Sequence, residues 1–207
     1  SSDVCSSDLV EERGLAGLSD LAGIPWKIPM DAFFEAWVET VFEGIVRQTG
    51  GHLKVGRKRA TLHPISWEPP YRGTQKFLWP DLIVEWESLT LIVDAKYKRH
   101  WEELQHRTWM DVEAEIREQH REDLLQVLAY ANLARTDRVV SCVVYPCSLE
   151  LWQSLNERRR LIHKADITAG TRSVSLWLTA VPMTADARRV DGALVEEVRR
   201  LLLLDAA

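Results

Sequence analysis

Two acidic residues and a lysine occur where a protein core would normally place apolar side chains. They are Asp81, Asp94 and Lys96, in the stretch PDLIVEWESLTLIVDAKYK that spans residues 80–98. This stretch has the pattern of two short apolar strands joined by a turn, and each strand carries one carboxylate at an interior position. A buried charge is strongly unfavourable unless it is paired or binds a metal ion. The pattern therefore predicts an ion-paired or metal-binding site on this hairpin.

The expected turn sets which residues of the hairpin face each other. If the turn is centred between Glu87 and Ser88, Asp81 lies directly opposite Asp94, with Cβ atoms about 5 Å apart. Side chains alternate between the two faces of a strand, so Lys96 shares the face of the two acids. The residues expected to point into the core from the other face are Leu82, Val84, Leu91, Val93 and Ala95.

Two carboxylates placed opposite each other repel, and a divalent cation would relieve that repulsion. Oxygen ligands from Asp81 and Asp94, completed by water, suit Mg²⁺ or Mn²⁺. The alternative is a pair of surface acids on a half-exposed sheet, with Lys96 as their salt-bridge partner. A different turn register would also separate the two acids.

A helix over residues 28–51 must lie beside this hairpin to complete such a site. Its apolar stripe consists of Met30, Phe34, Trp37, Val38, Val41 and Ile45. Glu35 lies at the edge of the stripe, about 100° around the helix from Phe34, and can reach the rim of the surface below. Glu39 and Glu43 lie further from the stripe and should point towards solvent.

The remaining elements predict an α/β fold with a mixed sheet. A second helix is expected within residues 102–135, with Leu124, Val127, Leu128 and Ala131 in its core stripe and with Gln126 and Tyr130 together on the opposite side. The other expected elements are a strand within 61–67, a buried strand over 138–146 ended by Pro146, a helix over 148–158, strands near 160–167 and 172–181, and a helix over 191–204. Strands that alternate with helices in this way favour α/β architecture.

Composition limits the classes of protein that remain. The chain has 207 residues, 46% of them hydrophobic, and a net charge of -5, which is typical of a globular domain and not of a basic nucleic-acid coat. Three cysteines provide no disulfide framework, and no apolar run is long enough to span a bilayer, so we expect a cytoplasmic protein without membrane association. We expect residues 1–27 to be a non-native or disordered leader and 28–207 to form the functional domain.

The order of the short motifs carries a family resemblance. Pro80-Asp81 followed by Asp94-Ala95-Lys96 resembles the signature of the PD-(D/E)xK nucleases. The segments FFEAWV, PDLIV, LIVDAKYK and QVLAY, taken together over residues 28–146, resemble the nuclease domain of McrC. That family supplies the cleaving subunit of the McrBC 5-methylcytosine-dependent restriction system.

The resemblance implies a fold, a reaction and a role for each residue. The fold would be a restriction-endonuclease-like core, and the activity would be Mg²⁺-dependent hydrolysis of DNA phosphodiester bonds. The implied metal ligands are Asp81, Asp94 and Glu35, the residue that orients the attacking water is Lys96, and the residues that support DNA binding are Gln126, Tyr130 and Lys98. The implied partners are double-stranded DNA and a separate McrB-like NTPase.

Two other functions stay open at the level of sequence. A chain of the same fold could act as a non-catalytic DNA-binding or NTPase-docking module, and an unrelated α/β domain could carry a polar hairpin by chance. The stretch GHLKVGRK, residues 51–58, lacks the Lys-Ser/Thr pair of a phosphate-binding loop. Any NTP-driven motor is therefore expected on another chain.

Overall fold

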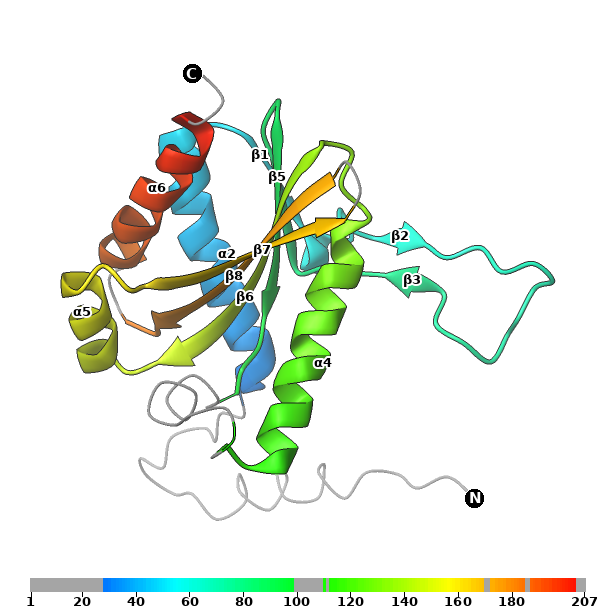
Figure 1. The fold of residues 1–207 in the computed structure, drawn as a ribbon, viewed down its shortest axis with the longest axis horizontal. Coiled ribbons are helices and arrows are strands. Elements are labelled where there is room, and N and C mark those ends of the chain that lie inside the picture. Colours follow the sequence, from blue (N-terminus) through cyan, green and yellow to red (C-terminus); the bar gives the residue numbers. More distant parts are fainter. Residues whose placement is uncertain (1–27, 99–109, 111, 170–171, 185–186, 204–207) are drawn as a thin grey trace, which may run out of the picture. The chain divides into compact units, whose positions relative to one another are not determined.

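The computed structural model describes residues 28–98, 110, 112–169, 172–184 and 187–203 (Figure 1). The expected leader, residues 1–27, lies outside these ranges, as does the part of the expected second helix that falls within 99–109 and at 111. From Asp31 onward the described residues belong to one compact unit.

Helix α2 (Met30–Thr49) confirms the helix expected from the apolar period. Phe34, Val38, Val41 and Ile45 are buried and form the core side of the helix. The helix ends at Gly50 and Gly51, which adopt φ angles of +71° and +99°. Glycine accepts these left-handed conformations without the steric clash that a side chain would cause.

A mixed six-stranded sheet with the order β1-β4-β5-β6-β8-β7 forms the centre of the unit. Its strands are β1 (His52–Val55), β4 (Leu82–Glu85), β5 (Leu89–Ala95), β6 (Arg138–Cys147), β7 (Ile162–Ala169) and β8 (Arg172–Pro182). Strands β5, β6 and β8 are parallel, whereas β1, β4 and β7 join the sheet in antiparallel pairs. This arrangement confirms the expected α/β fold and is consistent with a restriction-endonuclease-like core.

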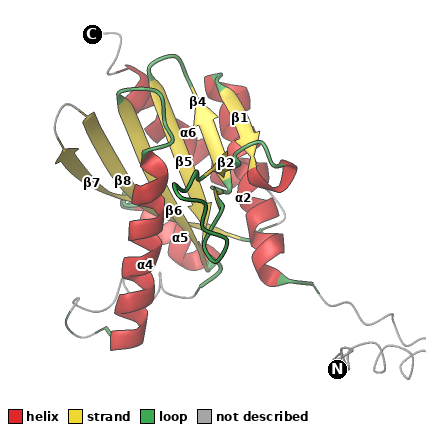
Figure 2. Ribbon diagram, turned by 90° about the vertical axis from the view of Figure 1, so that its right-hand side faces the viewer, coloured by secondary structure: helices red, strands yellow, loops and turns green. Residues whose placement is uncertain are grey.

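Helices flank this sheet on both sides. Helix α4 (Ala114–Ala131) connects β5 to β6 and packs on these two strands, while α2 and α6 (Ala187–Leu203) lie together on the other side of β5 (Figures 1 and 2). The buried side chains of α2, β4 and β5 belong to one apolar cluster. Strand β5, which carries Asp94, is therefore covered from both faces.

Several boundaries differ from the predicted ones. The strand expected within 61–67 is only β2 (His63–Pro64), which pairs with β3 (Phe77–Leu78) in a separate two-stranded sheet. Strand β1 was not predicted, and α6 begins four residues earlier than expected. The strands β7 and β8 and helix α5 (Leu149–Glu157) confirm the predictions for 148–181.

Pro146 does not end β6, contrary to the prediction. Strand β6 continues to Cys147 because it still pairs with β8 there. On its other side, β5 ends at Ala95, opposite Val144. Beyond that point no described residue pairs with β6 on the β5 side in the strand register, and a proline without an N–H group is tolerated at such an edge.

Candidate active site

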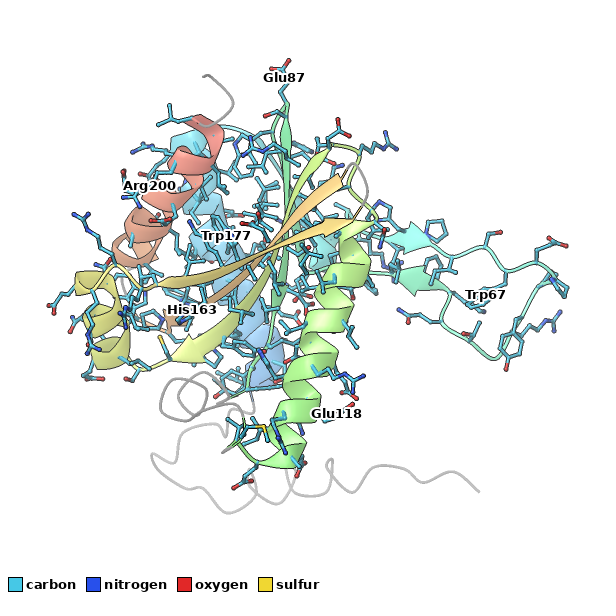
Figure 3. All side chains as sticks on the ribbon, in the orientation of Figure 1. Trp67, Glu87, Glu118, His163, Trp177 and Arg200 are labelled. Carbon is cyan, nitrogen blue, oxygen red and sulfur yellow. The ribbon has the colours of Figure 1, made fainter. Side chains whose placement is uncertain are left out.

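The β4–β5 hairpin has the register predicted from the turn. Leu82 pairs with Val93 and Val84 pairs with Leu91, so the turn is centred between Glu87 and Ser88. Glu87 lies at the exposed tip of the hairpin (Figure 3). The five residues expected to face the core, Leu82, Val84, Leu91, Val93 and Ala95, are all buried.

The same register places Asp81 across from Asp94. Asp81 immediately precedes β4, and its Oδ2 accepts a hydrogen bond of 2.7 Å from the backbone N–H of Ala95. Asp94 lies within β5 and is only 2% exposed. The alternative of two surface acids is therefore wrong for Asp94, which is part of the protein interior.

Lys96 joins the acids to helix α4. Its Nζ lies 2.7 Å from Oδ2 of Asp94 and donates a 2.8 Å hydrogen bond to Oε1 of Gln126. Nε2 of Gln126 in turn donates to the hydroxyl of Tyr130 at 2.8 Å. The ammonium group of Lys96 is therefore held between a carboxylate of the sheet and an amide of the helix.

The helical pattern predicted Tyr130 on the side of α4 opposite the core, and this prediction is wrong. Tyr130 is buried, and it packs with Ile83, Ile92 and Val139 against the sheet. Its hydroxyl donates to the carbonyl oxygen of Trp79 at 3.4 Å. The predicted pairing with Gln126 is present, but Tyr130 reaches it from inside the core.

Burial and like charge make ionisation of the facing acids unfavourable. Burial, followed by the charge of Asp94, raises the pKa of Asp81 from 3.8 to about 7. Burial also raises the pKa of Asp94, although Lys96 opposes this effect. Burial disfavours the charged form of Lys96, but the charge and hydrogen bond of Asp94 and the charges of Asp123 and Asp81 together prevail, so the pKa of the Lys96 ammonium is above its usual value.

Glu35, on α2, is coupled electrostatically to this site. It is half-buried, and burial raises the pKa of its carboxyl, with Arg57 opposing and Asp94 adding to the rise. The charge of Glu35 in turn contributes to the raised pKa of Asp81. Electrostatic coupling therefore links Glu35 to both acids of the hairpin.

The prediction for Glu39 is wrong, whereas Glu43 is exposed as expected. Glu39 is buried because Arg57 and Lys58 form ion pairs with it. Burial opposes its ionisation, but the hydrogen bonds from these two cations prevail and keep the pKa of Glu39 below its usual value. Glu39 serves to fix the segment after β1 on helix α2.

The donor atoms suit a hydrated divalent cation that takes one or two protein ligands. Oδ2 of Asp94 is buried and forms no hydrogen bond with a described residue, although Lys96 lies beside it. In the described ranges, no three His, Cys, Asp or Glu side chains are arranged so that they could hold a metal ion by themselves. Mg²⁺ commonly binds through one or two carboxylates and keeps several waters. Asp81 and Asp94 fit that requirement, and Glu35 stays a predicted ligand.

A second polar network, which the sequence analysis missed, adjoins the site on α4. Asp123 is buried, accepts a hydrogen bond from Tyr145 at 3.0 Å and forms a 2.7 Å ion pair with Lys98. Nδ1 of His120 lies 3.0 Å from the same tyrosine hydroxyl. Asp123 lies one helical turn before the core residue Val127 and therefore on the same side of α4. Extending the apolar period by one turn would have predicted a buried acid at this position. Lys98, predicted to support DNA binding, lies against this acid.

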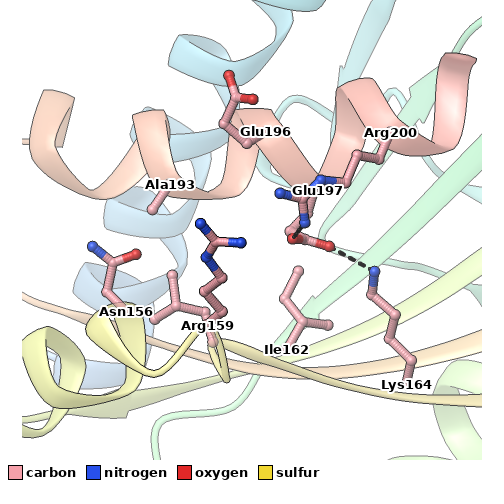
Figure 4. Close-up of a pocket in the computed structure, with 9 residues that line it drawn as sticks. Asn156, Arg159, Ile162, Lys164, Ala193, Glu196, Glu197 and Arg200 are labelled. Carbon is pink, nitrogen blue, oxygen red and sulfur yellow. Dashed lines mark hydrogen bonds and ion pairs between the residues drawn. The ribbon is translucent and has the colours of Figure 1, made fainter.

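A separate pocket of about 410 Å³ lies between α5, β7 and α6 (Figure 4). Its acidic side chains are compensated, because Glu197 pairs with Lys164 at 2.7 Å and also with Arg200, and Glu196 pairs with Arg199. The pocket therefore lacks the uncompensated negative charge that distinguishes the hairpin site.

Comparison with known protein families is consistent with this geometry. A family model described as McrBC 5-methylcytosine restriction system component matches residues 20–146. No curated protein matches the chain. None of the helices in the described ranges combines the length and hydrophobicity needed to cross a membrane. Because the matched segment covers more than half of the 207 residues and contains the whole hairpin site, the chain belongs to the McrBC 5-methylcytosine restriction system component family.

Proposed function

We propose that this chain is the DNA-cleaving subunit of a modification-dependent restriction system and hydrolyses phosphodiester bonds with the help of Mg²⁺ or Mn²⁺. The observation that carries the proposal is the buried pair Asp81 and Asp94 with Lys96 beside it. Such a pair is unfavourable for the metal-free fold. A role in binding a divalent cation gives that arrangement a function.

Asp81 and Asp94 would hold the cation, and Glu35 would contact it directly or through a water molecule. When bound, the cation would polarise the scissile phosphate and lower the pKa of an attacking water. The three carboxylates come from two separate elements, α2 and the hairpin. Their mutual repulsion would be relieved by the charge that they bind.

Lys96 would act as a fixed cation and not as a base. Its raised pKa keeps the ammonium protonated at neutral pH. A protonated amine can orient a water molecule and stabilise negative charge that develops on the phosphate. Gln126 and Tyr130 would hold Lys96 in position, since the amide of Gln126 contacts both of them.

The proposed partners are double-stranded DNA and a separate McrB-like NTPase. Family membership supports both, because the family takes its name from a 5-methylcytosine restriction system. A non-catalytic module of the same fold is the second candidate. The presence of the facing acids favours the nuclease, because a docking module has no use for that repulsion.

Cleavage of plasmid DNA that carries 5-methylcytosine tests the proposal. With Mg²⁺ or Mn²⁺ and an McrB-like NTPase with its nucleotide, we expect the wild-type protein to cut and Asp94→Asn to lose at least 100-fold in rate, a loss on the order of that for a catalytic group. Asp137→Asn is the matched control, because Asp137 is exposed and lies outside the site. Equal cutting by Asp94→Asn and wild type would refute the proposed site.

A further inference from the structure

A hairpin arm, residues 60–79, projects from the sheet next to the candidate site (Figures 1 and 3). It contains β2 and β3, and Ile65 continues their pairing by donating a 2.8 Å backbone hydrogen bond to Lys76. Beyond these contacts the arm has little interior of its own. Every residue from Ser66 to Gly73 is exposed.

The base of the arm is firmly attached beside the acids. Thr61 is fully buried, and its hydroxyl donates a 2.5 Å hydrogen bond to the carbonyl oxygen of Pro80. The indole N–H of Trp79 donates to the carbonyl oxygen of Gly56 at 2.9 Å. Because Pro80 is followed directly by Asp81, the anchor of the arm is also the anchor of the first acid.

The arm exposes aromatic surface that the rest of the unit does not cover. The exposed fractions are 44% for Trp67, 62% for Tyr71, 42% for Phe77 and 44% for Trp79. The rings of Trp67 and Tyr71 pack edge to face, with centroids 6.4 Å apart. Large apolar groups gathered on a projecting element indicate a surface that contacts a partner.

The same arm carries uncompensated positive charge, although the chain as a whole has a net charge of -5. Arg72 and Lys76 are exposed, and neither forms an ion pair with another residue that the structure describes. Glu68 is the acidic residue of the arm. By contrast, Arg57 and Lys58, which come just before the arm, both form ion pairs with Glu39.

We propose that this arm grips double-stranded DNA beside the bond to be cleaved, an inference that rests on the nuclease function proposed above. Arg72 and Lys76 would contact phosphates, and Trp67 and Tyr71 would pack against sugars or base edges. Free cations favour the phosphates of DNA over an apolar protein surface.

Binding to a fluorescent 30-base-pair duplex without divalent metal separates this inference from cleavage. We expect the double variant Arg72→Ala/Lys76→Ala to bind about tenfold more weakly, and its slope of log affinity against log salt to fall by about 1.8, since each lost phosphate contact removes about 0.9. Trp67→Ala/Tyr71→Ala should weaken binding with an unchanged slope. The matched control is Arg158→Ala/Arg160→Ala, which removes two exposed cations beyond α5.

The outcomes distinguish this inference from the proposed function. Wild-type protein that binds DNA but fails to cut it with metal, an McrB-like NTPase and its nucleotide would refute the nuclease. Weaker DNA binding by the arm variants in the same experiment would still support the arm. Arm variants that bind and cut like the wild type would overturn the arm and leave the nuclease intact. Arm variants that lose binding to an NTPase partner but keep the wild-type affinity for DNA would also overturn the proposed role of the arm. Equal melting temperatures by circular dichroism would establish that all variants are folded.

Discussion

At the scale of single residues, Asp81 and Asp94 each have only part of their charge compensated. Asp94 has Lys96 beside it, and Asp81 accepts one backbone hydrogen bond. Neither contact overcomes burial, since the pKa of both carboxyls stays above the usual value. The metal-free site is therefore under electrostatic strain at neutral pH.

Replacing Asp81 by asparagine should flatten the pH dependence of stability in metal-free protein. The folded state keeps the Asp81 proton up to about pH 7, whereas the unfolded chain loses it near 3.8. The folded state thus binds more protons between these values, and stability falls as the pH rises through this window. At about 1.4 kcal/mol for each pKa unit, the loss approaches about 4 kcal/mol above pH 7.

Urea unfolding in EDTA at pH 4.5 and pH 8 measures this difference. Asp81→Asn should be more stable than the wild type at pH 8 and close to it at pH 4.5. Asp137→Asn, at an exposed position, provides the control. A wild-type protein that became more stable as the pH rose would contradict the assignment.

Replacing Lys96 by alanine should affect both stability and chemistry. The change leaves Asp94 without its cation, and breaking a buried ion pair costs about 3–5 kcal/mol. The double variant Asp94→Asn/Lys96→Met should recover most of that stability while remaining inactive. Thermal unfolding and plasmid cleavage measured in parallel test this expectation. If the double variant regained cleavage along with stability, neither Asp94 nor Lys96 would have a catalytic role.

At the scale of elements, the site depends on a close approach between the segment after β1 and the start of β4. The backbone N–H of Gly56 donates a 2.7 Å hydrogen bond to the carbonyl oxygen of Asp81. A Cβ atom at Gly56 would lie 2.7 Å from the carbonyl oxygen of Pro80 and 2.9 Å from that of Asp81. Gly56, the second glycine of the GHLKVGRK stretch, thus serves backbone packing and not phosphate binding.

Gly56→Ala should therefore destabilise the fold. It should also reduce the rate of DNA cleavage, because it displaces Asp81. Overpacking against backbone atoms typically costs about 1–3 kcal/mol. Gly192→Ala is the matched control, because nothing lies within 4 Å of the added atom. It should be neutral or stabilise helix α6 by up to about 1 kcal/mol. Thermal melting curves of both variants test this expectation. An equal change in Tm for the two variants would show that Gly56 has no special packing role.

At the scale of the whole molecule, divalent metal should stabilise the fold as well as support chemistry. A ligand that binds only the folded state at 100 times its Kd adds about 2.7 kcal/mol. Mn²⁺ at millimolar concentration should therefore raise the Tm of the wild type, and EDTA should reverse the rise. NaCl of equal ionic strength should not reproduce it. An equal rise in Asp94→Asn would place the metal elsewhere.

Local rules were sufficient to predict the hairpin from the sequence. Strand alternation and a short turn determine which residues face each other, so the placement of Asp81 opposite Asp94, with Lys96 on the same face, followed without knowledge of the fold. The apolar period likewise predicted the core side of α2. Strand β1 escaped prediction because its four residues, HLKV, are too few to establish an alternating pattern.

Only the tertiary structure decided which polar groups would be buried. Glu39 was assigned to solvent because helical periodicity contains no information about Arg57 and Lys58, which approach from another element and neutralise it. Tyr130 was assigned to the outer side of α4 because the pattern does not show how far the sheet extends beneath a helix. Burial of a charged or polar side chain depends on partners distant in sequence, and only the packed fold brings those partners together.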